Sequence, residues 1–202
     1  MKLFERLPDS VTVNGKRIRM DFSFRNVLRM MEVLERDDLI PDARNFLALK
    51  CLCKRPPKDV NATLLIVRVL LFGTRTAPAN EQKITSFEQD APFIRAAFRQ
   101  EYGINLWRDD LHWLEFIELL HGLPEGNRYE EILGIRSRPM PAPTKWNAKE
   151  REWLFKAKQT YALKMTEEET AKKYEADVAK VFSGLMGIIQ KAEQEEVKPD
   201  GQ

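Results

Sequence analysis

Apolar and polar residues alternate over residues 11–20, and this period of two predicts a β-hairpin. Asn14 and Gly15 stand between the two alternating runs, a dipeptide that favours a two-residue type I′ turn. That turn pairs Val13 with Lys16. The apolar face then comprises Val11, Val13, Ile18 and Met20. Because an isolated hairpin is only marginally stable in water, we expect this face to pack on helices or on another chain.

Two amphipathic helices are predicted next, from apolar positions that recur with the helical period. Ser23 is expected to cap the first helix. Its apolar stripe comprises Phe24, Val27, Leu28, Met31 and Leu34. Pro41 is expected to start the second helix, which Pro56 and Pro57 end. The apolar side of the second helix comprises Phe46, Leu49 and Cys53.

Residues 59–72 are apolar on nearly all sides, which predicts a central element that is covered by the rest of the fold. Their β-branched residues leave a strand open as an alternative to a helix. The longest apolar run, residues 64–72, contains Arg68 and is far shorter than the ~20 residues that cross a bilayer. We therefore expect no membrane span. Gly73 and a polar loop follow.

The stretch from residue 90 to residue 138 is predicted to form two well-marked helices and a shorter third one. Asp90 is expected to cap the first of these helices and Gly103 to end it. Asp109 or Asp110 is expected to cap the second. The apolar stripe of the second helix comprises Trp113, Phe116, Ile117 and Leu120, and Gly122 and Pro124 mark its end. The third helix is expected to turn Tyr129, Ile132 and Leu133 inward.

Three prolines at alternating positions follow, Pro139, Pro141 and Pro143, and they favour an extended spacer. The predicted division of the chain is a β-hairpin with a helical core domain at 1–138, a linker at 139–146, amphipathic helices at 147–192 and a disordered tail at 193–202. We therefore predict that residues 1–138 fold without the rest. The fold class is mainly α: a helical domain with an N-terminal β-hairpin and a C-terminal helical hairpin or extension.

In the C-terminal part, Asn147 is expected to cap one helix, and a capping box of Thr166 and Glu169 opens another. The apolar residues of that second helix recur at spacings of three and four, as in a coiled coil. Its candidate partner-binding residues are Ala171, Tyr174, Val178, Val181, Phe182, Leu185 and Ile188. One interpretation is a helical hairpin folded back on the main domain. The other is a docking surface for a helical partner.

Charge and cysteine content narrow the class of protein. The 202 residues include 33 basic and 31 acidic ones, and this balance gives no global reason to expect nucleic acid or an anionic membrane as partner. Five cations gather near the N-terminus, namely Lys16, Arg17, Arg19, Arg25 and Arg29. No aromatic residues suited to stacking on bases interleave with these cations, so a solvated face is favoured over nucleic-acid binding. Cys51 and Cys53 are expected to be reduced thiols of a cytoplasmic protein, and the N-terminus lacks the apolar run of a signal peptide.

Candidate catalytic chemistry is missing from the sequence. His112 and His121 are nine residues apart and would point to opposite sides of one helix, so they cannot share a metal ion. No phosphate-binding loop, zinc-binding pattern or nucleophile elbow occurs. We therefore expect a protein that is not an enzyme and uses no metal, cofactor or small-molecule substrate.

Three segments carry a resemblance to a known family: SFRNVLRMMEVLE, DAPFIRAAFRQEYGINL and DLHWLEFIELLHGLPEGNRYEEILGIRSR. The most specific pattern comprises Asp110, Leu111, His112, Trp113, Gly122, Leu123, Pro124, Glu131, Ile132, Leu133, Gly134, Ile135 and Arg136. Residues 22–138 resemble the "gp-fifteen" family of long-tailed phages (siphoviruses) and prophages. The residues expected to form the core or to carry the family motif are Trp113, Phe116, Leu120, Gly122, Pro124, Leu133 and Gly134.

The resemblance implies a mainly helical, non-enzymatic tail assembly chaperone. Such a protein would bind the tape-measure protein in the host bacterial cytoplasm before tail-tube subunits polymerise, and it would be absent from the mature virion. The tail-tube protein and further copies of this chain are additional partners that it implies. Two alternatives stay open: a structural virion component, such as a connector or tail-tip protein, and a nucleic-acid-associated packaging or regulatory protein.

Overall fold

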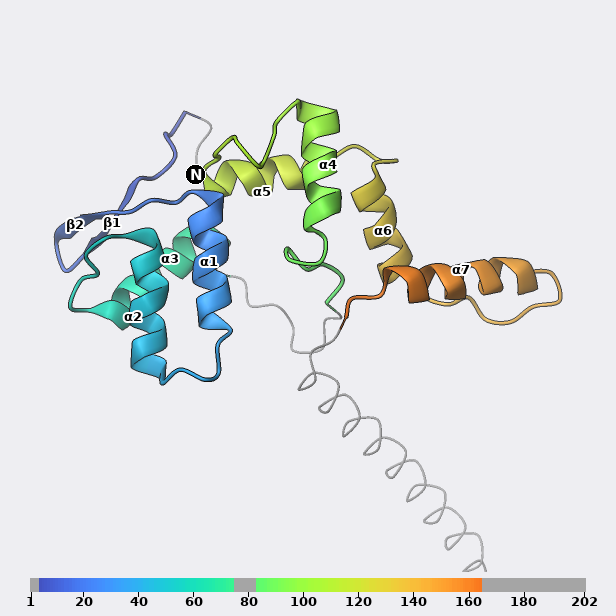
Figure 1. Ribbon diagram of the computed structural model, residues 1–202, viewed down its shortest axis with the longest axis horizontal. Helices are drawn as coiled ribbons and strands as arrows, with labels where there is room; N and C mark the ends of the chain where they lie inside the picture. The colour runs from blue at the N-terminus through green and yellow to red at the C-terminus, as the bar shows by residue number, and fades with distance from the viewer. Residues whose placement is uncertain (1–3, 75–82, 165–202) are drawn as a thin grey trace, which may run out of the picture. The chain divides into compact units, whose positions relative to one another are not determined.

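A computed structural model describes residues 4–74 and 83–164 of the chain. These residues form one two-stranded sheet and seven helices (Figure 1). In chain order the elements are β1 Ser10–Val13, β2 Lys16–Arg19, α1 Phe24–Leu34, α2 Pro41–Leu52, α3 Val60–Phe72, α4 Ala91–Tyr102, α5 Trp113–His121, α6 Arg128–Ser137 and α7 Ala148–Tyr161. The prediction of a mainly α fold with an N-terminal β-hairpin is confirmed.

The N-terminal hairpin has the predicted register, in which Val13 pairs with Lys16. Asn14 and Gly15 have φ angles of 48° and 73°, the left-handed conformation that both turn positions of a type I′ hairpin need. The buried residues of its apolar face are Val11, Val13 and Met20. Strand β1 packs on α3, and this contact covers the apolar face of a hairpin that would be marginal alone.

Helices α1 and α2 pack side by side (Figure 1). In α1 the side chain of Met30 is fully buried, although it lies outside the predicted stripe. In α2 the buried residues are Ala48, Leu49 and Leu52, whereas Phe46 is exposed. The expected position of Phe46 on the covered side is therefore wrong. A small residue, Ala48, lies in the covered face of α2 instead, and its size permits close approach of a neighbouring helix.

Residues 60–72 form helix α3, so the helix and not the strand is the correct prediction for this segment. Its buried residues are Thr63, Leu64, Val67 and Leu71. Leu65 and Val69 lie on the opposite side and are exposed. The prediction that this element is covered on all sides is therefore wrong for one face. The reason is that its main neighbours, β1 and α2, cover only part of its circumference.

The N-termini of four helices differ in detail from the predicted caps. At α7, Asn147 occupies the cap position but its side chain makes no cap hydrogen bond. The Ser23 hydroxyl donates to Asp110 Oδ1 at 2.6 Å and makes no cap hydrogen bond to α1. The Asp90 carboxylate makes no cap hydrogen bond to α4. His112, rather than either predicted aspartate, caps α5, because its Nδ1 accepts the Leu114 N–H at 3.2 Å. The predicted caps by Ser23, Asp90, Asn147, and Asp109 or Asp110 are therefore wrong in their hydrogen bonding.

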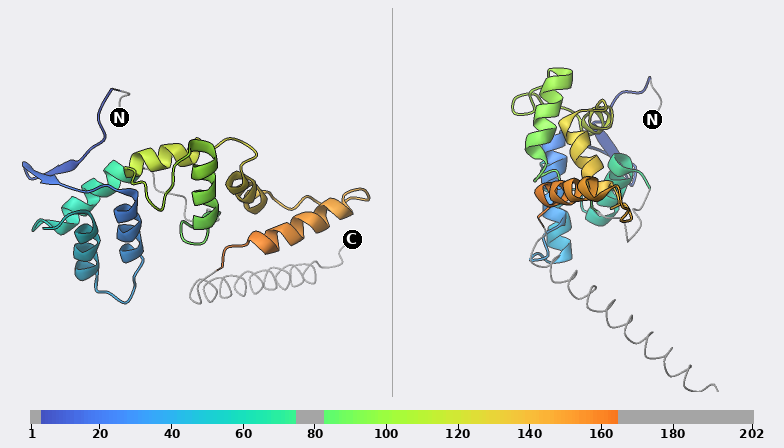
Figure 2. Two further views of the ribbon diagram at one scale, coloured as in Figure 1. Left: turned by 45° about the horizontal axis from the view of Figure 1, so that its top comes forward. Right: turned by 90° about the vertical axis from the view of Figure 1, so that its right-hand side faces the viewer.

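Helix α7 packs on α6 (Figure 2). Its Leu154 is fully buried. The chain divides into compact units between Ala162 and Leu163, so the proline-rich residues 139–146 lie inside the first unit and not at its end. The prolines do interrupt the helix, since α6 ends at Ser137 and α7 begins at Ala148. They separate two packed helices rather than two domains.

Candidate functional site

Two predicted sets of site residues have different outcomes. The partner-binding set, Ala171, Tyr174, Val178, Val181, Phe182, Leu185 and Ile188, lies outside the described residues, as do the Thr166–Glu169 capping box and the 193–202 tail. Within the motif set, Trp113, Phe116 and Leu120 are buried, Leu133 is partly buried, and Gly122, Pro124 and Gly134 are exposed. The motif therefore combines core positions with surface positions at helix ends.

Trp113 lies at the centre of an aromatic cluster with 2% of its surface exposed. Its ring stacks on Phe116 with centroids 5.8 Å apart, and its indole N–H donates to the Leu71 carbonyl at 3.3 Å. Phe116 also stacks between Phe24 and Phe98, at 5.0 and 5.1 Å. This cluster joins α1, α3, α4 and α5, so these motif residues stabilise the fold rather than present a reactive group.

Gly122 allows two helices to approach closely. The Tyr102 hydroxyl donates to the Leu119 carbonyl near the end of α5 at 2.8 Å. A Cβ atom at position 122 would lie 3.3 Å from that hydroxyl and 3.2 Å from the Glu118 carbonyl. Both distances are tighter than ordinary contacts, so a side chain at this position would push Tyr102 away from the helix end.

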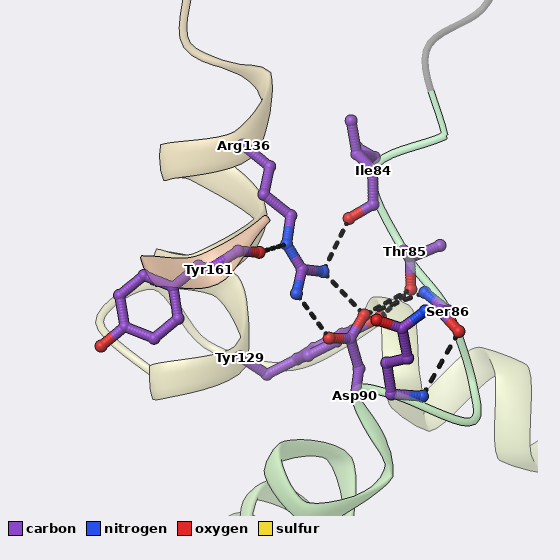
Figure 3. A network of polar contacts seen from close by, with 8 residues as sticks. Ile84, Thr85, Ser86, Asp90, Tyr129, Arg136 and Tyr161 are labelled. Atoms are coloured by element: carbon purple, nitrogen blue, oxygen red, sulfur yellow. Dashed lines mark hydrogen bonds and ion pairs between the residues drawn. The ribbon is translucent and has the colours of Figure 1, made fainter. Parts of the chain in front are cut away.

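A buried ion pair between Asp90 and Arg136 is the most elaborate polar site among the described residues (Figure 3). Arg136 Nη2 and Nη1 donate to the two carboxylate oxygens of Asp90 at 2.7 and 2.8 Å. The Ser86 N–H donates to the same carboxylate at 2.9 Å. The carboxylate is fully buried, and Arg136 is 9% exposed. Burial of two charges is offset here by a bidentate geometry and further hydrogen bonds.

The same ion pair connects α7 to the rest of the unit. Arg136 Nε donates to the Tyr161 carbonyl at 2.6 Å, and its Nη1 donates to the Ile84 carbonyl at 2.9 Å (Figure 3). Lys158 Nζ donates in turn to the Arg136 carbonyl at 2.8 Å. Sequence reasoning identified Arg136 only as a motif residue and Asp90 only as a cap. No local signal relates two positions 46 residues apart.

His112 also has a structural role. Its Nδ1 accepts a backbone N–H from α5, so its Nε2 carries the proton and donates to the Pro8 carbonyl at 3.0 Å. Among residues 4–74 and 83–164, no group of three or more His, Cys, Asp or Glu side chains is placed to hold a metal ion. None of the helices in the described part of the chain is long and apolar enough to span a bilayer.

The predicted basic patch is largely engaged in local contacts. Arg17 pairs with Asp9 at 2.9 Å, and Arg25 pairs with Asp110 at 2.7 Å. Arg29 donates to the Asn26 side chain at 3.3 Å. These contacts reduce the number of cations that are free to bind phosphates, and they favour the interpretation as a solvated face.

The outer face of α3 is the clearest candidate for a binding surface. We call Leu65, Ile66, Val69 and Phe72 the α3 outer stripe. Leu65 is 63% exposed and Val69 is 45% exposed. Leu65, Val69 and Phe72 follow the i, i+4, i+7 spacing of one helix face, opposite the buried Leu64 and Val67. Contiguous exposed apolar side chains of this kind mark sites of interaction.

A second group of exposed aromatic residues lies at and near α7. Trp146 precedes the helix, and Trp153 and Phe155 lie within it. Trp153 and Phe155 are two residues apart and lie on different flanks of the helix, whereas Trp146 lies in the turn before it. Lys145 Nζ lies 5.4 Å from the Trp146 ring centroid. These side chains form a less continuous surface than the α3 outer stripe because the buried Leu154 lies between the two flanks.

A family model described as Bacteriophage Gp15 protein matches residues 3–163. The chain belongs to the bacteriophage Gp15 family. The Gp15 match is longer than the stretch that carried the resemblance in the sequence, and it ends one residue beyond the first compact unit, Met1–Ala162. The family region and the compact unit therefore coincide. Neither a curated protein nor a solved structure matches the chain.

Proposed function

We propose that this Gp15-family protein is a tail assembly chaperone of a long-tailed phage. It binds the tape-measure protein in the host cytoplasm, keeps it soluble until tail-tube subunits polymerise around it, and does not remain in the virion. The role is not enzymatic, because masking an apolar surface requires binding and no chemical step. Family membership supports the phage context of this proposal.

The α3 outer stripe is the observation that carries the proposal. A long amphipathic helix exposes apolar residues at spacings of three and four, and helices of this kind bind apolar surfaces through anchors at i, i+3, i+4 and i+7. Leu65, Val69 and Phe72 present that same spacing on a helix that already belongs to a stable core. Full burial of one such side chain stabilises a complex by roughly 1.5–3 kcal/mol before ordering costs are subtracted.

The coiled-coil-like pattern at residues 171–188 provides a second predicted surface for a helical partner. Two apolar surfaces on one chain would let each copy cover more of a long partner. Binding to the tail-tube protein and self-association belong to the same proposal, since many copies on one tape measure would lie next to one another.

Co-expression with the tape-measure protein of the same genome tests the proposal. We expect affinity capture of the chain to recover a soluble complex, with light scattering giving several copies per tape measure. A tape measure that stays insoluble, together with stoichiometric amounts of the chain in purified particles, would contradict the proposal. That outcome would support a connector or tail-tip component instead.

A further inference from the structure

A small apolar cavity lies between α1, α4, α5 and the turn that follows α4, well apart in sequence from the α3 outer stripe. Its volume is about 180 Å³. Its apolar walls comprise Phe24, Leu28, Phe87, Ile94, Leu106 and Phe116. Ala91, two arginines (Arg25 and Arg95) and Trp107 complete the lining. Apolar walls with cations beside them fit a ligand that has an apolar part and an anionic part.

The two arginines of this cavity differ in the partners that their guanidinium groups contact. The Arg25 guanidinium donates to the Asp110 carboxylate at 2.7 Å, the Leu106 carbonyl at 2.7 Å and the Asp109 carbonyl at 2.9 Å. Arg95 stacks over the Trp107 ring at 4.3 Å and has no carboxylate partner among the described residues. Arg95 is therefore the cation that is available to an acidic ligand at this cavity.

Trp107 combines a fixed backbone with an exposed ring. Its backbone N–H is bound by the Asn105 side-chain carbonyl at 3.1 Å, and the Asp109 carboxylate accepts the Asn105 N–H at 2.7 Å. These bonds hold the turn, while the Trp107 side chain is 73% exposed. Exposed, pre-positioned tryptophan and arginine side chains are the residue types that contribute most to protein–protein binding.

The volume of the cavity limits the size of the group that can bind in it. A volume near 180 Å³ is comparable to the ~150 Å³ apolar cavity that holds one benzene ring, and it is smaller than the roughly 300–1,000 Å³ typical of sites for drug-sized ligands. One phenylalanine or leucine side chain matches this space. An extended cofactor does not.

We propose that this cavity is a second binding site, which accepts one aromatic or branched aliphatic side chain of an acidic protein segment and pairs a neighbouring carboxylate of that segment with Arg95. The occupant is a protein segment because a single side-chain-sized volume is combined with an exposed Trp107 and an adjacent cation. This site does not depend on the α3 outer stripe or on the identity of the partner that the stripe binds.

Three matched alanine-based helical peptides test the site on the full chain. The first carries one phenylalanine with a glutamate four residues later; the second replaces the phenylalanine by alanine; the third replaces the glutamate by glutamine. The readout is the NMR resonance of the Trp107 indole N–H. We expect a saturable shift with the first peptide, about threefold weaker binding of the third, as for an exposed ion pair, and no saturable shift with the second.

Two variants of the chain locate the binding. Arg95→Gln is expected to remove the difference between the glutamate and glutamine peptides while the dependence on phenylalanine remains. Ala91→Phe, which adds a ring to the cavity lining, is expected to abolish the shift without changing the melting temperature. The proposal would be overturned if the native chain bound the first (glutamate) and third (glutamine) peptides equally well, or if the first peptide gave no saturable shift. The Arg95→Gln result keeps the test decisive if Ala91→Phe lowers the stability.

Discussion

At the residue scale, Trp113 and Arg136 contribute to stability in different ways. Trp113 fills volume inside an aromatic cluster, so its removal leaves a cavity and unfilled contacts. Arg136 compensates a buried carboxylate, so its removal leaves Asp90 as a buried charge without a partner. Both residues belong to the motif that carried the family resemblance.

Trp113→Ala is expected to lower the free energy of unfolding by about 3–5 kcal/mol, the range for large-to-small changes in a core. Chemical denaturation measures this loss. Trp146→Ala is the matched control, since that tryptophan is almost fully exposed and its loss should change stability little. A loss below ~1 kcal/mol for Trp113→Ala would mean that the aromatic cluster is not packed as described.

Arg136→Ala is expected to cost about 3–5 kcal/mol, because one charge of a buried pair loses its partner. Arg138→Ala provides the comparison: Arg138 pairs with Glu150 at 2.6 Å, but both side chains are half exposed, so the loss should be under about 1 kcal/mol. Similar melting temperatures for the two variants would contradict the distinction between the buried and the exposed pair.

The two cysteines should react slowly with thiol reagents. Burial raises the pKa of both Cys51 and Cys53, so less of the reactive thiolate is present at pH 8 than for a free thiol. We expect Cys53, the more buried of the two, to react more slowly than Cys51, and both to react faster as the pH rises or after unfolding in guanidinium. A folded-state rate for Cys53 equal to its unfolded rate would refute this.

Local side-chain roles were only partly predictable from the sequence. The Asn14–Gly15 turn was predictable because its conformation depends on two adjacent residues. The role of Asp90 was not, since a good capping residue and a buried ion-pair partner look alike until Arg136 is placed beside it. The role of His112 as a cap was not predictable either, because histidine is not among the preferred capping residues.

At the element scale, helix positions followed from periodicity, but the covered side of each helix did not. Residues 59–72 are apolar all round, and this pattern cannot tell a buried helix from one with an exposed binding face. The α3 outer stripe therefore became visible only when its neighbours were in place. The prolines at 139–143 likewise predicted an interruption, which is present, and not the return of α7 onto α6.

A pair of truncations tests the position of the boundary. A chain of residues 1–164 is expected to melt cooperatively at the temperature of the full chain, since the first compact unit ends at Ala162. A chain of residues 1–138 would lose the buried Leu154 and the Tyr161 carbonyl that Arg136 binds. The second chain is expected to be less stable by about 2–5 kcal/mol or more. Equal melting temperatures of the 1–164 and 1–138 chains would support the domain boundary that the prolines predicted, after residue 138.

At the scale of the whole molecule, the amino-acid sequence limits the class of protein more than it defines the function. Balanced charge gives no global reason to expect nucleic acid as a partner, and membership of the Gp15 family indicates a phage protein. The candidate surfaces then follow from which apolar side chains the fold leaves exposed. A helix such as α3 keeps Leu65 and Val69 exposed although polar residues there would cost the fold little, which is consistent with selection for binding.

The most direct test compares how well two variants keep the co-expressed tape-measure protein soluble. Leu65→Gln/Val69→Gln removes apolar surface from the α3 outer stripe at two exposed positions, so the melting temperature should change little. Trp153→Gln/Phe155→Gln is the matched control on α7. We predict that the stripe variant reduces the soluble tape measure by about tenfold, as loss of a central apolar contact does, while the control retains most of it. Unchanged solubility with the stripe variant would contradict the central claim that α3 binds the tape-measure protein.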